Sequence, residues 1–214
     1  VWMPLVPQLK INYQLFLVDL PGFGQSSMMA WDIFKKQLLN QLPEQFVLLG
    51  WSMGGLYATR LALEEPERII HLLNITSSPR FLLSTDWPGV SHEVFNTFYQ
   101  NLLRDTRGTL KEFLKLHVRK NKLELALGGI PSFAGLESGL EILETWDFRQ
   151  QLKKFKQPAC YMFGRLDPIV PMSTMITMQE HYPTFEYFSF NRGAHMPFLS
   201  HMDIFINKIQ GLIK

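Results

Sequence analysis

The 214 residues include a single cysteine, Cys160, so no disulfide can form within the chain. No apolar run approaches the roughly 20 residues that a helix needs to cross a bilayer. No positively charged leader with an apolar core precedes the first predicted element either. The net charge is only +2, which gives no overall reason to expect nucleic acid or an anionic membrane as a partner. These absences favour a reducing compartment, and we expect a cytoplasmic monomer.

The usual metal-binding patterns are missing too, because the chain has no His-Glu-x-x-His motif and no pair of cysteines. We therefore expect neither a metal nor another cofactor. The composition is ordinary for a globular protein, with 46% hydrophobic and 19% charged residues. The length allows one substantial core and is too short for two comfortable domains.

The strongest signal is a stretch of ten residues, 46–55, with the sequence Phe-Val-Leu-Leu-Gly-Trp-Ser-Met-Gly-Gly. An apolar run leads into Gly50, Ser52 lies between glycines, and residues 56–62 have a helical pattern. A Gly-x-Ser-x-Gly pattern also arises by chance in turns, but this placement predicts a nucleophile elbow, which presents a serine clear of the sheet. We expect Gly50 and Gly54 to remove side chains where strand and helix nearly touch. The helix N-terminus would stabilise negative charge at the serine.

Apolar strands alternate with helices along most of the chain, which predicts an α/β protein with a mostly parallel, doubly wound sheet covered on both faces. The expected strands are residues 14–18, 46–49, 69–75, 159–163 and 185–190. The expected helices of this part are residues 30–40, 56–63, 172–181 and 201–213. In between, residues 80–152 show helical periodicity without a convincing strand. We therefore expect a core made of residues 1–79 and 153–214, interrupted by a helical cap at residues 80–152.

A serine hydroxyl needs a base to remove its proton, and the base needs an acid to orient it. In a hydrolase sheet the acid and then the histidine follow the serine along the chain. Asp167 and His195 fit this order, and each lies in a loop just after a predicted strand, where open parallel sheets place their active sites. Asp19 precedes the serine and its Pro-Gly-Phe-Gly sequel reads as a structural turn. The histidines that lie within predicted strands or helices, or at their ends, are His71, His92, His117 and His181.

Several stretches of the chain match one known family. They are residues 18–24, 50–56, 77–79 with 86–89, 139–143, 147–150 and 193–198. On these residues the chain resembles the α/β-hydrolases, and among them the family of pimeloyl-acyl-carrier-protein methyl ester esterases of biotin synthesis. The elbow and the histidine loop are common to many hydrolases, whereas the Trp-Pro-Gly and Gly-Leu-Glu-Ile-Leu segments of the insertion are far more specific.

The resemblance implies a carboxylesterase that needs no cofactor. Ser52 would attack the ester carbonyl, His195 would shuttle the proton, and Asp167 would hold the imidazole. Methanol would leave first, and water would then release the pimeloyl carrier protein from the acyl-enzyme. The backbone N–H of Met53 would be one oxyanion donor. The family's second donor lies in a His-Gly-Trp-Gly-like loop that this sequence does not contain.

In the hydrolase fold, the strand that carries this loop lies between the strands expected at residues 14–18 and 46–49. Without that strand, two apolar strands would face a gap with unpaired backbone groups, and each dry group would cost several kcal/mol. We therefore expect the natural protein to have roughly thirty further residues before Val1, which would carry the missing N-terminal strands.

The insertion carries much of the positive charge. Residues 104–122 contain seven basic and two acidic residues, a local net charge of +5 within a chain of +2. This pattern suits a solvated helix face as well as a docking surface for an acidic partner. The resemblance implies that the partner is an acyl carrier protein. The candidate docking residues are Arg104, Arg107, Lys111, Lys115 and Arg119.

A helix is expected over residues 108–122, and the resemblance places part of it along an acyl channel. The candidate substrate-binding residues are Trp51, Ser52, Met53, Phe113, Leu114, Lys115, Leu116, His117 and His195. Alternatively, Phe113 and Leu116 pack the cap onto the core. In either case a narrow apolar channel suits a medium-length acyl chain better than a bulky lipid.

Two other functions stay open at this point. One is a general short-chain esterase, or a peptidase-like hydrolase, on the same fold. The other is a catalytically idle hydrolase fold that binds acyl groups or carrier proteins, which the missing oxyanion loop would favour. Assays with a carrier-bound methyl ester and with simple p-nitrophenyl esters distinguish the three.

Overall fold

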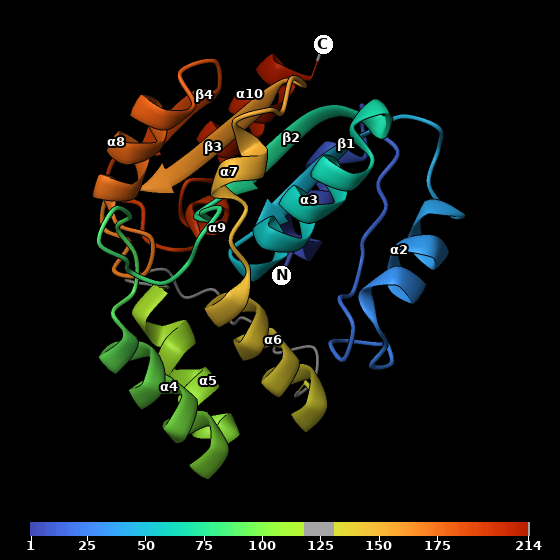
Figure 1. Ribbon diagram of the computed structural model, residues 1–214. Coiled ribbons are helices and arrows are strands. Elements are labelled where there is room, and N and C mark those ends of the chain that lie inside the picture. Colours follow the sequence, from blue (N-terminus) through green and yellow to red (C-terminus); the bar gives the residue numbers. More distant parts are fainter. Residues whose placement is uncertain (118–130, 214) are drawn as a thin grey trace.

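A four-stranded parallel sheet forms the centre of the computed structural model, which describes residues 1–117 and 131–213, without the side chains of residues 114–117. The strands are β1 (Phe46–Trp51), β2 (Ile69–Ile75), β3 (Ala159–Gly164) and β4 (Glu186–Phe190), and they lie side by side in that order (Figure 1). Four of the predicted strands are thereby confirmed. Their ends differ from the predicted ones by at most two residues.

The strands are paired in a register that brings their carboxyl ends to one edge of the sheet. Trp51 pairs with Ile75, Ile75 with Met162, and Gly164 with Phe190. Because all four strands are parallel, the loops that follow them leave the sheet at this same edge. Functional sites of open parallel sheets lie at such an edge.

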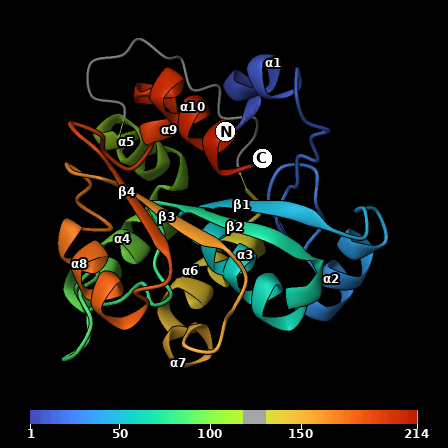
Figure 2. The ribbon, with the colours of Figure 1, turned by 90° about the horizontal axis from the view of Figure 1, so that it is seen from above.

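Helices cover both faces of the sheet (Figure 2). On one face lie α3 (Met53–Glu64) and α8 (Met172–His181), with α2 (Trp31–Leu39) packed against α3. The opposite face carries η1 (Met3–Leu5), α1 (Val6–Leu9), α9 (Pro197–Ser200) and α10 (Met202–Leu212), and η2 (Pro66–Arg68) leads into β2. Within the described ranges, no helix combines the length and the apolar character that a membrane crossing requires.

The core is divided between these two helical layers. Leu72, Tyr161 and Phe163 pack on the side of α3 and α8, whereas Leu73 and Met162 pack on the side of α9 and α10. Successive side chains of a strand point to opposite faces, so a strand buried on both faces is apolar along most of its length. This explains why β3 and β2, the latter apolar except for His71 and Asn74, are recognisable in the sequence.

The insertion is helical in its described parts, with α4 (His92–Arg104), α5 (Thr106–His117), α6 (Phe133–Thr145) and α7 (Arg149–Leu152). Helices α4, α5 and α6 lie beyond the carboxyl edge of the sheet (Figure 1). Helix α5 corresponds to the helix expected over residues 108–122, of which residues 118–122 lie outside the described residues. The division of the chain into a core and a cap at residues 80–152 stays a prediction.

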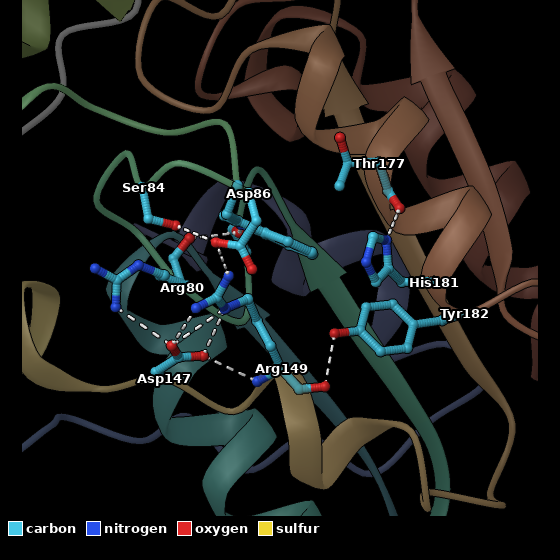
Figure 3. A network of polar contacts seen from close by, with 10 residues as sticks. Arg80, Ser84, Asp86, Asp147, Arg149, Thr177, His181 and Tyr182 are labelled. Carbon is cyan, nitrogen blue, oxygen red and sulfur yellow. Dashed lines mark hydrogen bonds and ion pairs between the residues drawn. The ribbon is translucent and has the colours of Figure 1, made fainter.

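A charged network joins the two ends of the insertion (Figure 3). Arg80 and Asp147 form an isolated antiparallel bridge and an ion pair of 3.3 Å. Arg149 donates to Asp147 at 2.8 Å and to Asp86 at 2.9 Å, and its carbonyl accepts a hydrogen bond of 2.9 Å from the hydroxyl of Tyr182. Burial raises the pKa of Asp147, but the hydrogen bonds from Arg149 outweigh it and hold this pKa below its ordinary value. The charged pairs therefore hold the two ends of the insertion together, and the hydrogen bond from Tyr182 links them to the core.

The strand expected at residues 14–18 does not form, so that prediction is wrong. Phe16, Leu17 and Val18 are between 40% and 52% exposed. The four-stranded sheet ends at β1, and no neighbouring strand among the described residues pairs with this segment. An apolar run becomes a strand only where its backbone groups find a partner strand.

Candidate active site

The turn between β1 and α3 presents Ser52 in a strained conformation. Its φ of 53° and ψ of −124° lie in a region that residues other than glycine rarely populate. A Cβ on Gly50 would lie only 2.5 Å from the carbonyl oxygen of Gly54, so strand and helix approach closely, as predicted. The side chain of Ser52 thus stands at the apex of a strand–turn–helix, which is the geometry of a nucleophile elbow.

The second glycine that permits this close packing is not the expected one. A side chain on Gly54 would meet nothing within 4 Å, so the prediction that Gly54 relieves a collision is wrong. A Cβ on Gly55 would instead clash with the side chain of Ser77 and lie 2.9 Å from Oδ1 of Asn74. The reason is the helical rotation between neighbouring residues, which turns buried Gly55, and not Gly54, toward the end of β2.

The structure brings Ser52, His195 and Asp167 into one hydrogen-bonded relay. The Ser52 Oγ lies 2.8 Å from Nε2 of His195, and Nδ1 of His195 lies 2.8 Å from Oδ2 of Asp167. The second carboxylate oxygen, Oδ1, accepts the backbone N–H groups of Ile169 at 2.8 Å and Val170 at 3.2 Å. The side chains of His195 and Asp167 are fully buried. A carboxylate held in this way favours the tautomer with a proton on Nδ1, which leaves Nε2 free to accept the serine proton.

The acid and the base reach this position from the loops after β3 and β4, and the two loops are bonded to each other. The N–H of Leu166 donates to the carbonyl of Gly193 at 2.8 Å. A Cβ on Gly164, the last residue of β3, would clash with the carbonyl of Ala194. A glycine at the end of β3 therefore lets the two loops pack against each other.

Met53 lies where an oxyanion donor is expected. It is the first residue of α3 and directly follows Ser52, so its N–H has no acceptor in a preceding turn of the helix. The positive end of the helix dipole lies at the same point. The side chain of Met53 points toward α6, where its Sδ lies so close to Gly139 that a Cβ on this glycine would be only 3.0 Å away. The backbone of Met53 can thus act at the site while its side chain contacts the cap.

Two of the expected substrate-binding aromatic residues contact His195. The ring of Phe113 lies 6.2 Å from the imidazole and 5.5 Å from the ring of Phe98. The ring of Trp51 lies 5.5 Å from the imidazole, and its indole N–H donates to the carbonyl of His195 at 2.7 Å. For the remaining expected substrate-binding residues of α5, the side chains lie outside the described part: Leu114, Lys115, Leu116 and His117.

The described candidate docking residues lie on the surface of the helical insertion. Arg104, at the end of α4, is exposed and donates to the side chain of Asn101 at 3.2 Å. Arg107 and Lys111 are exposed on α5. The side chain of Lys115 and the whole of Arg119 lie outside the described residues, so the continuation of this basic stripe stays a prediction.

The rival residues lie in other settings. The carboxylate of Asp19 accepts the N–H of Gln25 at 2.9 Å within its own turn. His71 is buried in β2, where burial lowers the pKa of its imidazole. His181 bonds to the carbonyl of Thr177 in its own helix. Among the residues that the structure describes, no group of three or more His, Cys, Asp or Glu side chains is placed to hold a metal ion.

Sequence reasoning did not select two residues that lie next to the site, Thr76 and Ser77. No motif marks either of them, although Ser77 lies in the matched segment 77–79. The hydroxyl of Thr76 donates to the carbonyl of His195 at 2.8 Å, and that of Ser77 donates to the carbonyl of Ser52 at 2.9 Å. The one general signal is that they are the first and second residues after the buried strand β2. Residues at that position of a parallel sheet lie at the functional edge.

Comparison with known proteins gives consistent results. A family profile described as the alpha/beta hydrolase fold matches residues 1–202. A pimeloyl-[acyl-carrier protein] methyl ester esterase from Legionella pneumophila (strain Corby) is 59% identical over 214 residues, which cover 100% of this chain and 90% of that protein. A protein of the same name from Aeromonas salmonicida (strain A449) is 36% identical over 225 residues, covering 98% of this chain and 89% of that protein.

Solved structures show the same fold at low identity. A hydrolase from Pseudomonas aeruginosa PA01 has a TM-score of 0.81 at 19% identity, covering 99% of this chain and 84% of that one. An esterase from Exiguobacterium antarcticum has a TM-score of 0.79 at 22% identity, covering 89% and 77%. At these identities the likeness concerns the fold alone.

Proposed function

This chain belongs to the α/β-hydrolase family, and from that premise we propose that it is a serine carboxylesterase that hydrolyses the methyl ester of a pimeloyl chain bound to an acyl carrier protein. The observation that carries the chemistry is the relay of two 2.8 Å contacts from Ser52 through His195 to Asp167. The substrate follows from the relatives, since proteins 59% and 36% identical over nearly the whole chain bear the name of this esterase. That name places the reaction in biotin synthesis.

The reaction begins when Oγ of Ser52 attacks the ester carbonyl and its proton passes to Nε2 of His195. Asp167 stabilises the imidazolium, and the N–H of Met53 stabilises the negative charge on the carbonyl oxygen. The intermediate collapses, His195 returns the proton to the methoxy oxygen, and methanol leaves. Water then attacks the acyl-enzyme by the same path in reverse and releases the carrier-bound acid. We assign one oxyanion donor, the N–H of Met53, and no second donor among the residues that the structure describes.

The insertion supplies the two features that this substrate needs. Phe98 and Phe113 form an apolar wall that reaches the imidazole of His195, and an apolar wall suits an alkyl chain. Arg104, Arg107 and Lys111 lie exposed on the adjoining helices, where positive charge attracts an acidic carrier protein. Lys115 and Arg119 would continue this surface along the same stripe.

The test compares wild-type protein, Ser52→Ala and the matched control Ser27→Ala, in which an exposed serine is removed. Pimeloyl-carrier methyl ester and p-nitrophenyl butyrate are the substrates, and a fluorophosphonate probe reports the activated hydroxyl. We expect Ser52→Ala to lose more than about 10⁴-fold in kcat on both substrates, and to lose labelling, because both need the activated hydroxyl. The control should keep wild-type rates.

Two outcomes contradict the proposal and point to the alternatives. If wild-type protein cleaves the p-nitrophenyl ester but not the carrier-bound ester, the chain is a general short-chain esterase. If it cleaves neither but still binds the carrier protein, it is an idle binding module. Persistent labelling of Ser52→Ala would show that another residue is the nucleophile.

A further inference from the structure

The backbone carbonyl of His195 accepts hydrogen bonds from two side chains of the sheet. The indole N–H of Trp51, the last residue of β1, donates to it at 2.7 Å. The hydroxyl of Thr76, the residue after β2, donates to it at 2.8 Å. The two donors come from neighbouring strands, since Trp51 and Ile75 are register partners. The carbonyl is thus held from the end of the sheet, independently of the Asp167 contact that holds the imidazole ring.

Thr76 adopts a backbone conformation that its residue type disfavours. It is fully buried and has a φ of +43°, in the left-handed region that β-branched residues rarely occupy. Its N–H donates to the carbonyl of Met162 in β3 at 2.7 Å, which fixes the peptide on the other side. Strain of this kind persists where the surrounding structure requires it, and it gathers at functional sites. Here it directs the Thr76 hydroxyl toward the histidine loop.

The same short segment also holds the nucleophile. The carbonyl of Ile75 accepts the N–H of Ser52 at 3.0 Å, and the hydroxyl of Ser77 donates to the carbonyl of Ser52 at 2.9 Å. Residues 75–77 therefore form hydrogen bonds with the backbone of Ser52 and with the backbone of His195, the two residues joined by the contact between Oγ and Nε2. A shift of either loop relative to the other would have to break one of these bonds.

We propose that Thr76 is a positioning residue, whose hydroxyl acts with the indole N–H of Trp51 to hold the backbone of His195 so that Nε2 stays within hydrogen-bond distance of Ser52. The inference rests on the proposed function, because it takes Ser52 and His195 as the reacting pair. Proton transfer depends steeply on alignment, and a displacement of about 1 Å can cost on the order of 100-fold in rate. Loss of the hydroxyl frees the histidine loop on one side, and this lowers kcat more than it alters substrate binding.

Three variants separate this role from a merely structural one. Thr76→Val removes the hydroxyl and keeps the β-branched shape, whereas Thr76→Ser keeps the hydroxyl. Thr174→Val is the matched control, because Thr174 is also fully buried and its hydroxyl also donates to a backbone carbonyl, that of Pro88. The measurements are kcat and KM on p-nitrophenyl butyrate, thermal unfolding, and the downfield proton resonance of His195 Nδ1–H in its bond to Asp167.

We expect Thr76→Val to lower kcat by about 10- to 100-fold, with KM changed less than about twofold and the Nδ1–H resonance weakened or lost. Thr76→Ser should recover most of kcat and the resonance. Thr174→Val should keep both, even if its unfolding temperature falls by as much as that of Thr76→Val. Wild-type kcat and an unchanged resonance in Thr76→Val would overturn the proposal.

Two further measurements keep the result decisive. If Thr76→Val does not fold, Trp51→Phe removes the other donor and keeps an aromatic ring, and an unchanged kcat in that variant contradicts the proposal. If the wild-type protein shows no hydrolysis that depends on Ser52, the proposed function fails. The Nδ1–H resonance still decides the positioning role in that case: its loss in Thr76→Val supports the role, and its persistence refutes it.

Discussion

Replacing Asp167 by asparagine keeps the size of the side chain but changes which of its atoms can accept a hydrogen bond. In the native site Oδ1 accepts the N–H groups of Ile169 and Val170, while Oδ2 faces Nδ1 of His195. The asparagine oxygen must stay with the two backbone donors, since the opposite rotamer would leave buried N–H groups facing a buried NH₂ group. The new NH₂ group then faces His195.

An NH₂ group opposite Nδ1 requires Nδ1 to be the acceptor, so the proton of the neutral imidazole moves to Nε2. Nε2 then carries a hydrogen where it should accept the Ser52 proton across 2.8 Å. A wrong tautomer of this kind costs about 10⁴-fold in kcat, which corresponds to about 5 kcal/mol of activation free energy. We expect this loss in the steady-state hydrolysis of p-nitrophenyl butyrate, with KM nearly unchanged because the side chain of Asp167 is fully buried.

The matched control is Asp19→Asn. Asp19 is also an aspartate whose carboxylate accepts a backbone N–H, that of Gln25 at 2.9 Å, but it does so within a turn that contains neither Ser52 nor His195. This variant should keep wild-type kcat. Turnover of Asp167→Asn within about tenfold of wild type would refute the tautomer reasoning and would require another acid to orient His195.

Three other results follow from the described contacts. The double variant Arg107→Glu, Lys111→Glu should lose about tenfold in kcat/KM on the carrier-bound ester but not on p-nitrophenyl butyrate, and the loss should shrink at high salt; an equal loss on both esters would contradict a docking role. Burial raises the pKa of the Cys160 thiol to about 12, so Ellman's reagent should detect no thiol in the native protein and one after denaturation. Arg149→Met should lower the free energy of unfolding by about 1–2 kcal/mol at pH 7 in a denaturant titration. Because the pKa of Asp147 is lowered in the folded protein, the difference in unfolding free energy between wild type and Arg149→Met should be complete above the ordinary pKa of 3.8. It should vanish as the pH falls through the lower folded pKa. A difference that persists in acid would contradict the ion pair between Arg149 and Asp147 as its cause.

Local patterns were sufficient to predict most of the core. The largely apolar runs of β2 and β3 are what a sheet covered on both faces needs, although β2 also contains the buried polar residues His71 and Asn74. The helices α2, α8 and α10 follow apolar spacing of 3.6 residues. The order serine, aspartate, histidine along the chain, each just after a strand, was enough to select Ser52, Asp167 and His195. These residues could be selected because parallel strands bring their following loops to a single edge.

The failures share one physical cause, which is that the deciding contact is distant in sequence. Residues 14–18 have the apolar character of a strand, but pairing decides whether a strand forms, and β1 ends the described sheet. Gly55, and not Gly54, meets Ser77 because of how α3 is rotated over β2. Thr76 shows its part in the site only through a positive φ and a contact with a residue 119 positions later.

Segments 86–89 and 147–150 illustrate the same limit in a favourable case. Both segments are among the stretches that carry the resemblance, but no local pattern indicates that they meet. In the structure Arg149 binds Asp86 and Asp147 together, and Arg80 joins them from the start of the insertion (Figure 3). An ion pair can be recognised from the sequence only once it is known which charged residues lie next to each other.

The most direct test of the account is to identify the covalent intermediate on the carrier-bound substrate. Because the methyl ester lies at the free end of the pimeloyl chain, attack by Ser52 would expel methanol and leave the whole carrier protein attached to the enzyme. The enzyme is mixed with pimeloyl-carrier methyl ester, the reaction is quenched in acid within one turnover, and intact masses are measured. We expect a species whose mass is the sum of the enzyme and the carrier-bound substrate minus the mass of methanol. Peptide mapping should place the acyl group on Ser52, and Ser52→Ala should give neither this species nor methanol. Methanol release by Ser52→Ala at the wild-type rate, or an acyl group on a peptide without Ser52, would contradict the account.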